Sequence, residues 1–309
     1  MPDPSRLVFV GTGLLGSVLV GHIAPVARER GIAMVVNDLD HAAAATLAAR
    51  FDGVTAVDGL AGVPAGDAVL CLCVTNSAGV TSVVEAAAAA GIVTDGSIVV
   101  DFSSVPPAFA VETAARLAES GIRYLDAPLT GGMAAAYAGT MVTMAGGDHQ
   151  ALDAVRWIAN AFSQRVVWTG ASGNGALLKT INNWIGNTAA VAAMEGVVIL
   201  RHAGLSNDAI LEVLNNGPAA TYFSMSRYPR YLADRDASSD AELGLVTKDL
   251  RIAEEAVAQI GATPVLSLLA QSMWQGAVTK YGKSGDMLRM IDYVSRSTFG
   301  LSWEQIDAD

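Results

Sequence analysis

The sequence predicts a two-domain α/β protein, with an open, doubly wound sheet in the first half and an all-helical second half. Short apolar runs alternate with helix-like segments up to about residue 170, which is typical of βαβ units. Beyond that point the strand pattern disappears. A proline-free apolar stretch at 176–203 predicts a joining helix about 40 Å long at roughly 1.5 Å per residue. We therefore expect one domain at 1–171 and a second at 172–309.

Length and composition agree with two globular domains. The chain has 309 residues, of which 52% are hydrophobic and 16% are charged, so it can bury two cores. A net charge of -11 disfavours nucleic acid or an anionic membrane as the main partner, since both attract basic surfaces. The histidines are scattered and the only cysteines are Cys71 and Cys73, so we expect no metal site. The start of the chain has no secretion signal pattern, and we expect a cytoplasmic protein.

The first strand and helix frame a glycine-rich turn. An apolar run at 6–10 is followed at once by a helical pattern that extends to about Arg30. Between them the G-x-G-x-x-G spacing suits a tight turn, close approach of a pyrophosphate, and packing of helix on strand. This context predicts a Rossmann-type dinucleotide site, with the backbone amides of the new helix facing the phosphates. The residues of this predicted dinucleotide site are Gly11, Gly13, Leu14, Leu15 and Gly16.

The second strand, at 33–37, ends beside an acidic residue. Asp38 follows Gly16 by about 20 residues, the distance at which an acid reaches the adenosine ribose in such folds. A carboxylate there accepts hydrogen bonds from the ribose hydroxyls and repels a 2′-phosphate. We expect NAD, with NADP less favoured. The alternative is a solvated aspartate in a turn.

Two further strands end in small polar residues. The strand at 68–74 leads through Val74 into Thr75, and the strand at 97–101 leads into Ser103 and Ser104. The carboxyl edge of a parallel sheet is where these folds hold ligands. We expect Val74, Thr75 and Ser104 to contact the cofactor, although serines before prolines are also ordinary helix caps.

A candidate anion site follows the next strand. The strand at 123–126 leads into Thr130, Gly131 and Gly132, a hydroxyl and two glycines whose free amides can converge on a carboxylate. Strands near 141–145 and 165–168, with a helix at 148–162 between them, complete the first domain.

The long helix carries a cation and an amide near its start. Lys179 and Asn183 lie four residues apart and so share a helical face. Burial of an ammonium group costs free energy unless the group is paired with an anion or takes part in the chemistry of a site. The alternative is a lysine that reaches solvent beside a solvated asparagine.

The second half is predicted to be helical. Helices are expected at 206–216, 241–260, 264–278 and 286–295, and the stretch at 221–240 is expected to be mostly irregular with short helical pieces.

These segments together resemble the β-hydroxyacid dehydrogenases, most closely the 3-hydroxyisobutyrate dehydrogenases. The resemblance covers nearly the whole chain. It rests on five motifs in order: Gly11 to Gly16, Ser103-Ser104 with Pro107, Asp126 to Gly132, Gly173 to Asn183, and Lys248-Asp249-Leu250. Thr130, Leu129 and Ser104 replace the commoner serine, valine and threonine.

The resemblance implies a site and an activity. Lys179 would be the catalytic lysine, Asn183 a substrate-binding residue, and Thr130, Gly131 and Gly132 the carboxylate site, while Lys248 would lie near the cofactor. The implied reaction is reversible oxidation of a small 3-hydroxy carboxylate by NAD, with Lys179 as general acid and base. An ordinary lysine pKa near 10.4 would have to be lowered by burial and nearby positive charge. The family commonly forms dimers or tetramers.

Two alternatives remain open at this point. A reductase of the same fold could act on semialdehydes, glyoxylate-type compounds or imines, although imine reductases usually lack the lysine. A non-catalytic dinucleotide-binding protein is the alternative from another class.

Overall fold

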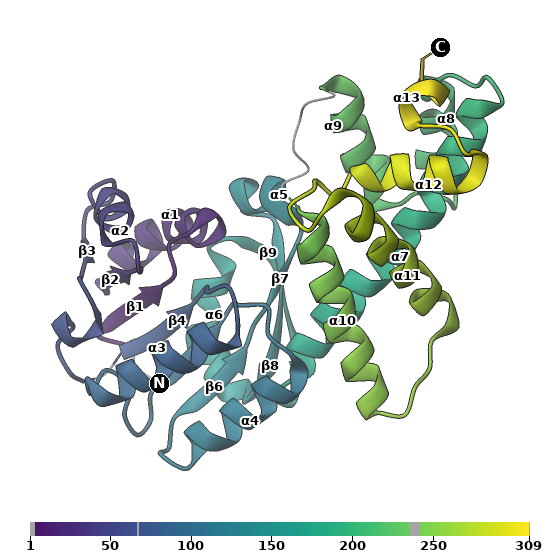
Figure 1. Cartoon of the computed structure of the whole chain (residues 1–309). Coiled ribbons are helices and arrows are strands. Elements are labelled where there is room, and N and C mark those ends of the chain that lie inside the picture. Colours follow the sequence, from purple (N-terminus) through teal and green to yellow (C-terminus); the bar gives the residue numbers. More distant parts are fainter. Residues whose placement is uncertain (1–3, 67, 235–240, 309) are drawn as a thin grey trace. The chain divides into compact units, whose positions relative to one another are not determined.

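A computed structural model describes residues 4–66, 68–234 and 241–308 of the chain (Figure 1). The chain divides into two compact units, Met1–Lys179 and Thr180–Asp309. The division falls inside the long helix, a little beyond the boundary at 171/172 that the sequence indicated. The first unit is a mostly parallel sheet covered by helices and the second is helical, which confirms the predicted fold class.

The first unit is built on one nine-stranded sheet. Its path runs β3-β2-β1-β4-β5-β6-β8-β7, with β9 paired to β8. From β1 the chain goes first to β2 and β3 on one side and then to β4, β5 and β6 on the other, so the strand order reverses between β1 and β4. The strands are β1 Arg6–Val10, β2 Ala33–Asn37, β3 Val54–Ala56, β4 Ala68–Leu72, β5 Ile98–Asp101, β6 Arg123–Asp126, β7 Leu129–Thr130, β8 Met141–Gly147 and β9 Ser163–Gly170.

Helices cover both faces of this sheet. Alternate residues of the central strands supply two separate cores: Leu7 and Phe9 face one core, and Val8 and Val10 face the other. Strands buried on both faces read as continuous apolar runs, which is why β1 and β4 were recognisable from sequence. The helices of this unit are α1 Leu14–Glu29, α2 His41–Ala48, the short η1 Leu60–Gly62, α3 Ser77–Ala89, α4 Pro107–Ala118, α5 Gly132–Ala138 and α6 His149–Asn160.

The direction of the sheet changes at its far end. Strand β8 runs antiparallel to β6 and β7, and parallel to β9. Pairing β6 with β8 brings Asp126 opposite Gly146. Strand β8 therefore pairs both with β6, which ends in Asp126, and with β7, which contains Thr130.

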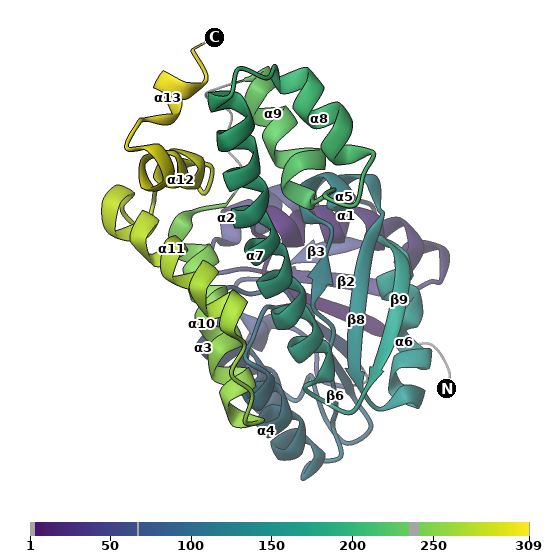
Figure 2. The same ribbon diagram turned by 90° about the vertical axis from the view of Figure 1, so that its right-hand side faces the viewer.

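Helix α7, Asn174–His202, is a single unbroken helix of 29 residues that is seen along its length in Figure 2. Its first turns belong to the first unit and the rest belongs to the second. Among the described residues it is the one helix that is long and apolar enough to cross a membrane, a test that the core helix of a soluble protein also passes.

The second unit contains helices only, apart from one isolated β-bridge between Glu242 and Asp286, as far as its described residues show. Its core is centred on Met194, Val197 and Trp274, each of them fully buried. The elements are α8 Asn207–Asn215, the π-helical η2 Phe223–Arg227, α9 Tyr228–Ala233, α10 Leu243–Gln259, α11 Val265–Tyr281, α12 Arg289–Phe299 and α13 Trp303–Ile306.

The stretch after α8 is more regular than expected. The sequence predicted mostly irregular structure at 221–240, but residues 222–233 are helical, with residues 235–240 outside the described part. Phe223 and Tyr228 are buried and their rings stack 5.4 Å apart. Aromatic packing stabilises a π-helical turn that has no simple sequence pattern.

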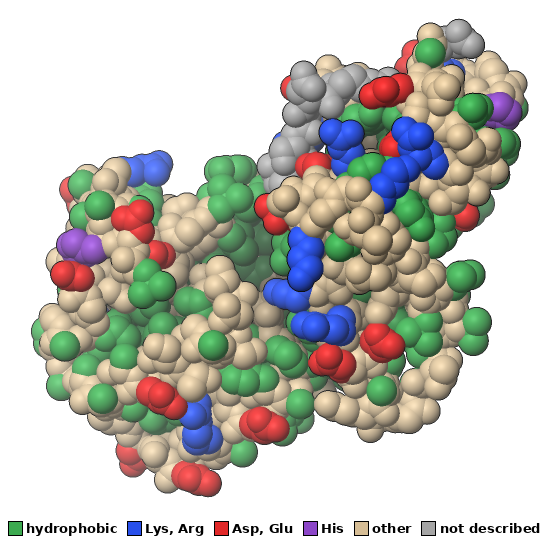
Figure 3. Space-filling view, viewed as in Figure 1, with side chains coloured by type: hydrophobic (Ala, Val, Ile, Leu, Met, Phe, Trp, Pro, Cys, Tyr) green, Lys and Arg blue, Asp and Glu red, His purple; other side chains and the backbone are tan. Residues whose placement is uncertain are grey.

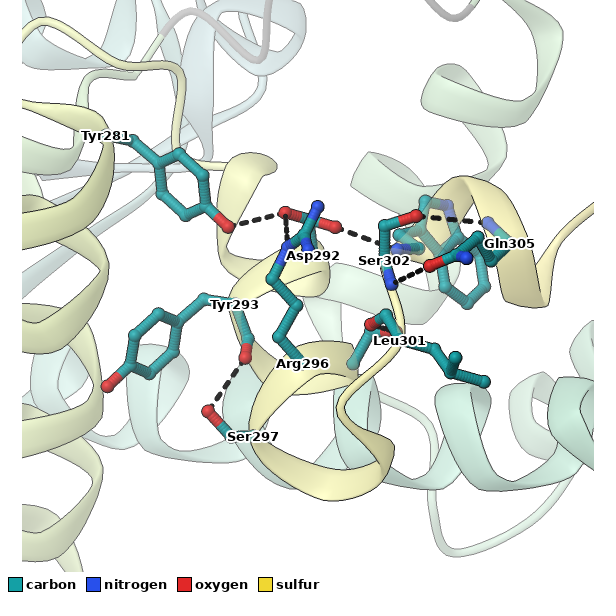
Figure 4. A network of polar contacts seen from close by, with 10 residues as sticks. Tyr281, Asp292, Tyr293, Arg296, Ser297, Leu301, Ser302 and Gln305 are labelled. Atoms are coloured by element: carbon teal, nitrogen blue, oxygen red, sulfur yellow. Dashed lines mark hydrogen bonds and ion pairs between the residues drawn. The ribbon is translucent and has the colours of Figure 1, made fainter.

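A polar network holds the last described segment. In Figure 4 the Asp292 carboxylate accepts hydrogen bonds from the Tyr281 hydroxyl, the Arg296 guanidinium at 2.9 Å and the Trp303 backbone N–H at 2.8 Å. Ser302 and Gln305 form a capping box at the start of α13. These bonds join α11, α12 and α13 within the second unit.

Candidate active site

The glycine-rich turn after β1 is shaped by close backbone approaches. A Cβ on Gly11 would lie 2.2 Å from the Cys73 carbonyl oxygen, and one on Gly16 would lie 1.9 Å from the Gly11 carbonyl oxygen. Side chains at these two positions are therefore excluded. A Cβ on Gly13 would meet nothing within 4 Å, so the protein leaves space beside this residue for a ligand.

Helix α1 begins without a side-chain cap. Its N-cap residue is Gly13, and no side chain bonds the amides of the first turn, which contains Leu14 and Leu15. In the same unit, helices α2, α3 and α6 are capped by Asp40, Asn76 and Asp148, whereas α4 and α5, like α1, have no side-chain cap. Uncapped amides and the positive end of the helix dipole suit a phosphate. The turn thus fits the pyrophosphate of a dinucleotide.

Asp38 lies at the end of β2 and contacts this turn. Its carboxylate accepts hydrogen bonds from the Thr12 backbone N–H at 2.6 Å and the Thr12 hydroxyl at 3.2 Å. It also accepts one from the Asp40 N–H at 3.0 Å. Asp38 is partly exposed, so its carboxylate can still accept hydrogen bonds from a ribose, and that role stays a prediction.

The loop after β4 lies next to the glycine turn. Cys73 donates its backbone N–H to the Val10 carbonyl at 2.9 Å, and Val74 donates its N–H to the Ser103 hydroxyl at 2.9 Å. Thr75 and Ser104 are exposed, whereas Ser103 is only 3% exposed. Of the two serines considered, Ser103 is therefore used inside the protein and Ser104 is the one open to a ligand.

The buried carboxylate of Asp101 is hydrogen-bonded to the loop that contains Ser103. Asp101, fully buried at the end of β5, accepts hydrogen bonds from the Ser103 N–H at 2.8 Å and the Tyr124 hydroxyl at 2.7 Å. Burial raises the pKa of Asp101 to about 6, although the bonds from Ser103 and Tyr124 act in the opposite direction. The nearby Asp126 carboxylate raises it further. Asp101 is thus a titratable group behind the cofactor loops.

The predicted carboxylate site is a turn with unusual backbone angles. Gly131 has φ +130° and Gly132 has φ +73°, angles that favour glycine. Successive amides in such conformations form a concavity that binds anions. Both glycines are exposed, and Thr130 is partly buried.

Lys179 lies near the start of α7, where it is partly buried. It is the last residue of the first unit, the unit that also contains the glycine turn and the Thr130 turn. The structure therefore carries the lysine, the cofactor loops and the anion site in one compact unit.

Asn183 and Lys248 belong to the second unit and share a partner. The Asn183 amide donates to the Asp249 carboxylate at 3.2 Å, and the Lys248 ammonium lies 3.7 Å from the other oxygen of Asp249. The Trp274 indole donates to the Asn187 carbonyl at 3.2 Å and joins α11 to α7. Asp249 thus contacts both predicted residues, one by a hydrogen bond and the other by an ion pair. The sequence reasoning assigned it no role, although it stands in the Lys248-Asp249-Leu250 motif.

Most of the predicted cofactor residues lie at the carboxyl edge of the parallel strands. Gly11, Asp38, Val74 and Ser104 follow the carboxyl ends of β1, β2, β4 and β5. The strand order reverses between β1 and β4, which is where open α/β sheets bind ligands. Fold and site together define a dinucleotide-binding α/β protein.

Comparison with known proteins agrees with this class. Residues 6–170 match the family of the NAD binding domain of 6-phosphogluconate dehydrogenase. Residues 173–294 match the family described as NAD-binding of NADP-dependent 3-hydroxyisobutyrate dehydrogenase. The chain belongs to the β-hydroxyacid dehydrogenase family.

Individual relatives are distant. The 2-(hydroxymethyl)glutarate dehydrogenase of Eubacterium barkeri is 23% identical, over 89% of this chain and 90% of the relative. A solved structure of Mycobacterium tuberculosis 3-hydroxyisobutyrate dehydrogenase with L-serine superposes with a TM-score of 0.80 at 23% identity, covering 94% of this chain and 98% of that one. An imine reductase of Streptomyces aurantiacus reaches a TM-score of 0.61 at 17% identity, covering 95% and 99%. At these identities the solved structures show the shared fold.

Proposed function

We propose that the protein reversibly oxidises a small 3-hydroxy carboxylate to the corresponding aldehyde or keto acid with NAD as the acceptor. The observation that carries this proposal is the combination, in one compact unit, of a partly buried lysine with a dinucleotide turn and an anion-binding turn. The lysine is Lys179. Membership of a dehydrogenase family and relatives named for hydroxy acids support it.

Each predicted residue has a chemical role in this proposal. The amides of Gly131 and Gly132, with Thr130, hold the substrate carboxylate. Lys179 accepts the hydroxyl proton during oxidation and returns it during reduction, while Asn183 keeps the substrate oriented. When bound, the nicotinamide supplies the hydride acceptor. Lys248 lies beside Asp249 and contributes positive charge in the second unit.

NAD is the proposed cofactor because of Asp38. Its carboxylate lies against Thr12 in the glycine turn, where a 2′-phosphate would meet a negative charge. Comparison of kcat/KM with NAD and with NADP measures this preference. A higher value for NADP would contradict the role given to Asp38.

Replacement of Lys179 by alanine tests the function directly. We expect kcat to fall by about 100-fold or more, because general acid–base catalysis contributes roughly that factor. The affinity for NADH, measured by fluorescence titration, should stay within about twofold. Lys280→Ala, at an exposed position in α11, is the matched control and should retain full turnover. Near-normal turnover of Lys179→Ala would refute the proposal.

A panel of candidate substrates separates the proposal from its alternatives. The panel contains 3-hydroxyisobutyrate, L-serine and 2-(hydroxymethyl)glutarate, together with an ester and an amide of the best substrate. The acids should reduce NAD and the neutral derivatives should react poorly, because the anion site needs a carboxylate. Reduction of cyclic imines, with no reaction of any hydroxy acid, would favour an imine reductase, and no reaction at all would favour a non-catalytic dinucleotide-binding protein.

We propose that the chain forms a homodimer or homotetramer in the cytoplasm and binds neither nucleic acid nor membrane. Large apolar side chains of the second unit are exposed, among them Ile185 on α7 and Val265, Leu266 and Leu269 at the start of α11. The net charge of -11 disfavours nucleic acid and anionic membranes as partners. On the face shown in Figure 3, Lys and Arg are few on the first unit, whereas several gather on the second unit. Light scattering across a range of concentrations measures the oligomeric state, and a monomer throughout would contradict this part of the proposal.

A further inference from the structure

The start of helix α7 is held by a carboxylate from a distant strand. Asp126, at the end of β6, accepts a hydrogen bond from the Gly173 backbone N–H on Oδ1 at 2.8 Å. Its other oxygen, Oδ2, accepts one from the Ala176 backbone N–H at 2.8 Å. The residue is only 1% exposed. Both carboxylate oxygens of one buried side chain are therefore used to bind the first turn of the helix.

Glycines leave the space that this contact requires. A Cβ on Gly175 would lie 2.3 Å from the Met144 carbonyl oxygen and 2.6 Å from the Asp126 carbonyl oxygen. A Cβ on Gly146 would lie 2.7 Å from Oδ1 of Asp126. The backbone of α7 thus presses directly on β6 and β8, and the carboxylate is enclosed by backbone on both sides.

This contact differs from the ordinary helix caps of the molecule. Asp40, Asp148 and Ser206 each cap their own helix three residues ahead, at exposed positions. Asp126 instead lies 47 and 50 residues from its partners and comes from the sheet. A negative charge at a helix N-terminus is also favoured by the helix dipole. The contact therefore fixes where the helix starts relative to the sheet, which an ordinary cap does not do.

We propose that Asp126 is a positioning residue for Lys179: it fixes the first turn of α7 on the end of β6 and so sets where the lysine lies. Lys179 follows Ala176 by three residues, less than one helical turn. From Asp126 the chain continues through Ala127 and Pro128 to the Thr130 turn. By holding α7 on this strand end, Asp126 sets the position of the lysine relative to the anion site. This inference rests on the proposed function, in which Lys179 moves the substrate proton.

A double-mutant cycle tests the inference. Asp126→Asn keeps the size of the side chain. It replaces one accepting carboxylate oxygen by an amide NH₂ group, which cannot accept the hydrogen bond of the backbone N–H that it faces. With the best hydroxy acid of the panel and saturating NAD, we expect kcat to fall by about 10- to 100-fold, since small displacements of reacting groups have effects of that order. In the Lys179→Ala background, the same substitution should change kcat by less than about threefold, because the residue acts through the lysine.

Controls separate positioning from general destabilisation. Asp148→Asn removes a cap carboxylate from α6 and should leave kcat unchanged. NADH titration verifies that each variant is folded and counts its active sites. Gly175→Ala, which displaces α7 while Asp126 is intact, is the second variant and should reproduce the pattern of Asp126→Asn.

The outcomes are distinct. Equal losses from Asp126→Asn in the two backgrounds, or no loss in the wild-type background, would overturn the positioning role and leave the proposed function in place. Normal turnover of Lys179→Ala alone would overturn the proposed function and this inference with it.

Discussion

At the residue scale, the fully buried Asp101 makes stability depend on pH. Its pKa is raised to about 6 by burial, whereas an unfolded aspartate titrates near 3.9. Between these values the folded state binds more protons than the unfolded state, so this carboxyl costs stability as pH rises. Its contribution is therefore most favourable below about pH 4 and is lost as pH rises through about 6.

We predict that Asp101→Asn removes this dependence. The free energy of unfolding of the variant minus that of the wild type should increase between pH 4 and pH 7 by roughly 2–3 kcal/mol, at about 1.4 kcal/mol per unit of pKa difference. The amide can still accept from the Ser103 N–H and donate to the Tyr124 hydroxyl. Urea unfolding at several pH values measures the difference, with the exposed Asp52→Asn as control. A difference that does not change with pH would contradict the role assigned to burial.

Individual site residues were predictable from sequence only where a motif specifies their spacing. Gly11 and Gly16 follow from the strand, turn and helix pattern, and the backbone contacts explain why glycine is needed there. The role of Asp126 had no local signal, because its partners are backbone N–H groups about 50 residues away and every residue except proline has such a group. The assigned roles of Lys179 and Asn183 stay predictions.

At the scale of single elements, the turn before α1 offers a matched pair of substitutions. Gly16→Ala would place a Cβ 1.9 Å from the Gly11 carbonyl oxygen, whereas Gly13→Ala would meet no protein atom within 4 Å. We predict that Gly16→Ala destabilises the first unit by at least about 1–3 kcal/mol, as overpacking does. Gly13→Ala should leave stability within about 0.5 kcal/mol but weaken NADH binding by about 10-fold or more, because its methyl group occupies the space proposed for the pyrophosphate.

Thermal unfolding and NADH titration of both variants measure these effects. Tight NADH binding by Gly13→Ala would show that the cofactor phosphates lie elsewhere.

Most elements were predictable because their apolar residues recur with a clear helical or strand period. The central strands, α7, α10 and α11 were expected close to their observed bounds. Strand β3 and the helical residues 222–233 were not. A strand of three residues has too few positions to show alternation. The π-helical turn depends on the packing of Phe223 and Tyr228 on the rest of the unit, so tertiary contacts decide its conformation.

At the scale of the whole molecule, each unit has hydrophobic core residues of its own, and helix α7 takes part in both units. The end of α7 is held by an ion pair within the second unit. The Arg201 guanidinium lies 3.0 Å from the Asp307 carboxylate, and their side chains are 6% and 4% exposed. The same oxygen of Asp307 accepts from the Asn207 amide at 3.0 Å.

We predict that Asp307→Ala destabilises the second unit by about 3–5 kcal/mol, because it leaves a buried guanidinium unpaired. Glu304→Ala, which removes a carboxylate from an exposed position of α13, should cost less than about 1 kcal/mol. Urea unfolding followed by tryptophan fluorescence detects this unit through Trp184, Trp274 and Trp303, together with the first unit through Trp157 and Trp168. Equal unfolding midpoints for the two variants would contradict the prediction.

The enclosed carboxylate at the end of β6 has a practical consequence for directed evolution. Positions 173 and 175 lie within six residues of Lys179 along the chain, and position 146 lies against Asp126, so a library aimed at the start of α7 would include them. Nearly every codon other than glycine at 146 and 175 would bring a side-chain atom into collision with backbone or carboxylate oxygens. Screening effort is better spent on the exposed Thr75 and Ser104, the proposed cofactor contacts that follow β4 and β5 rather than β6.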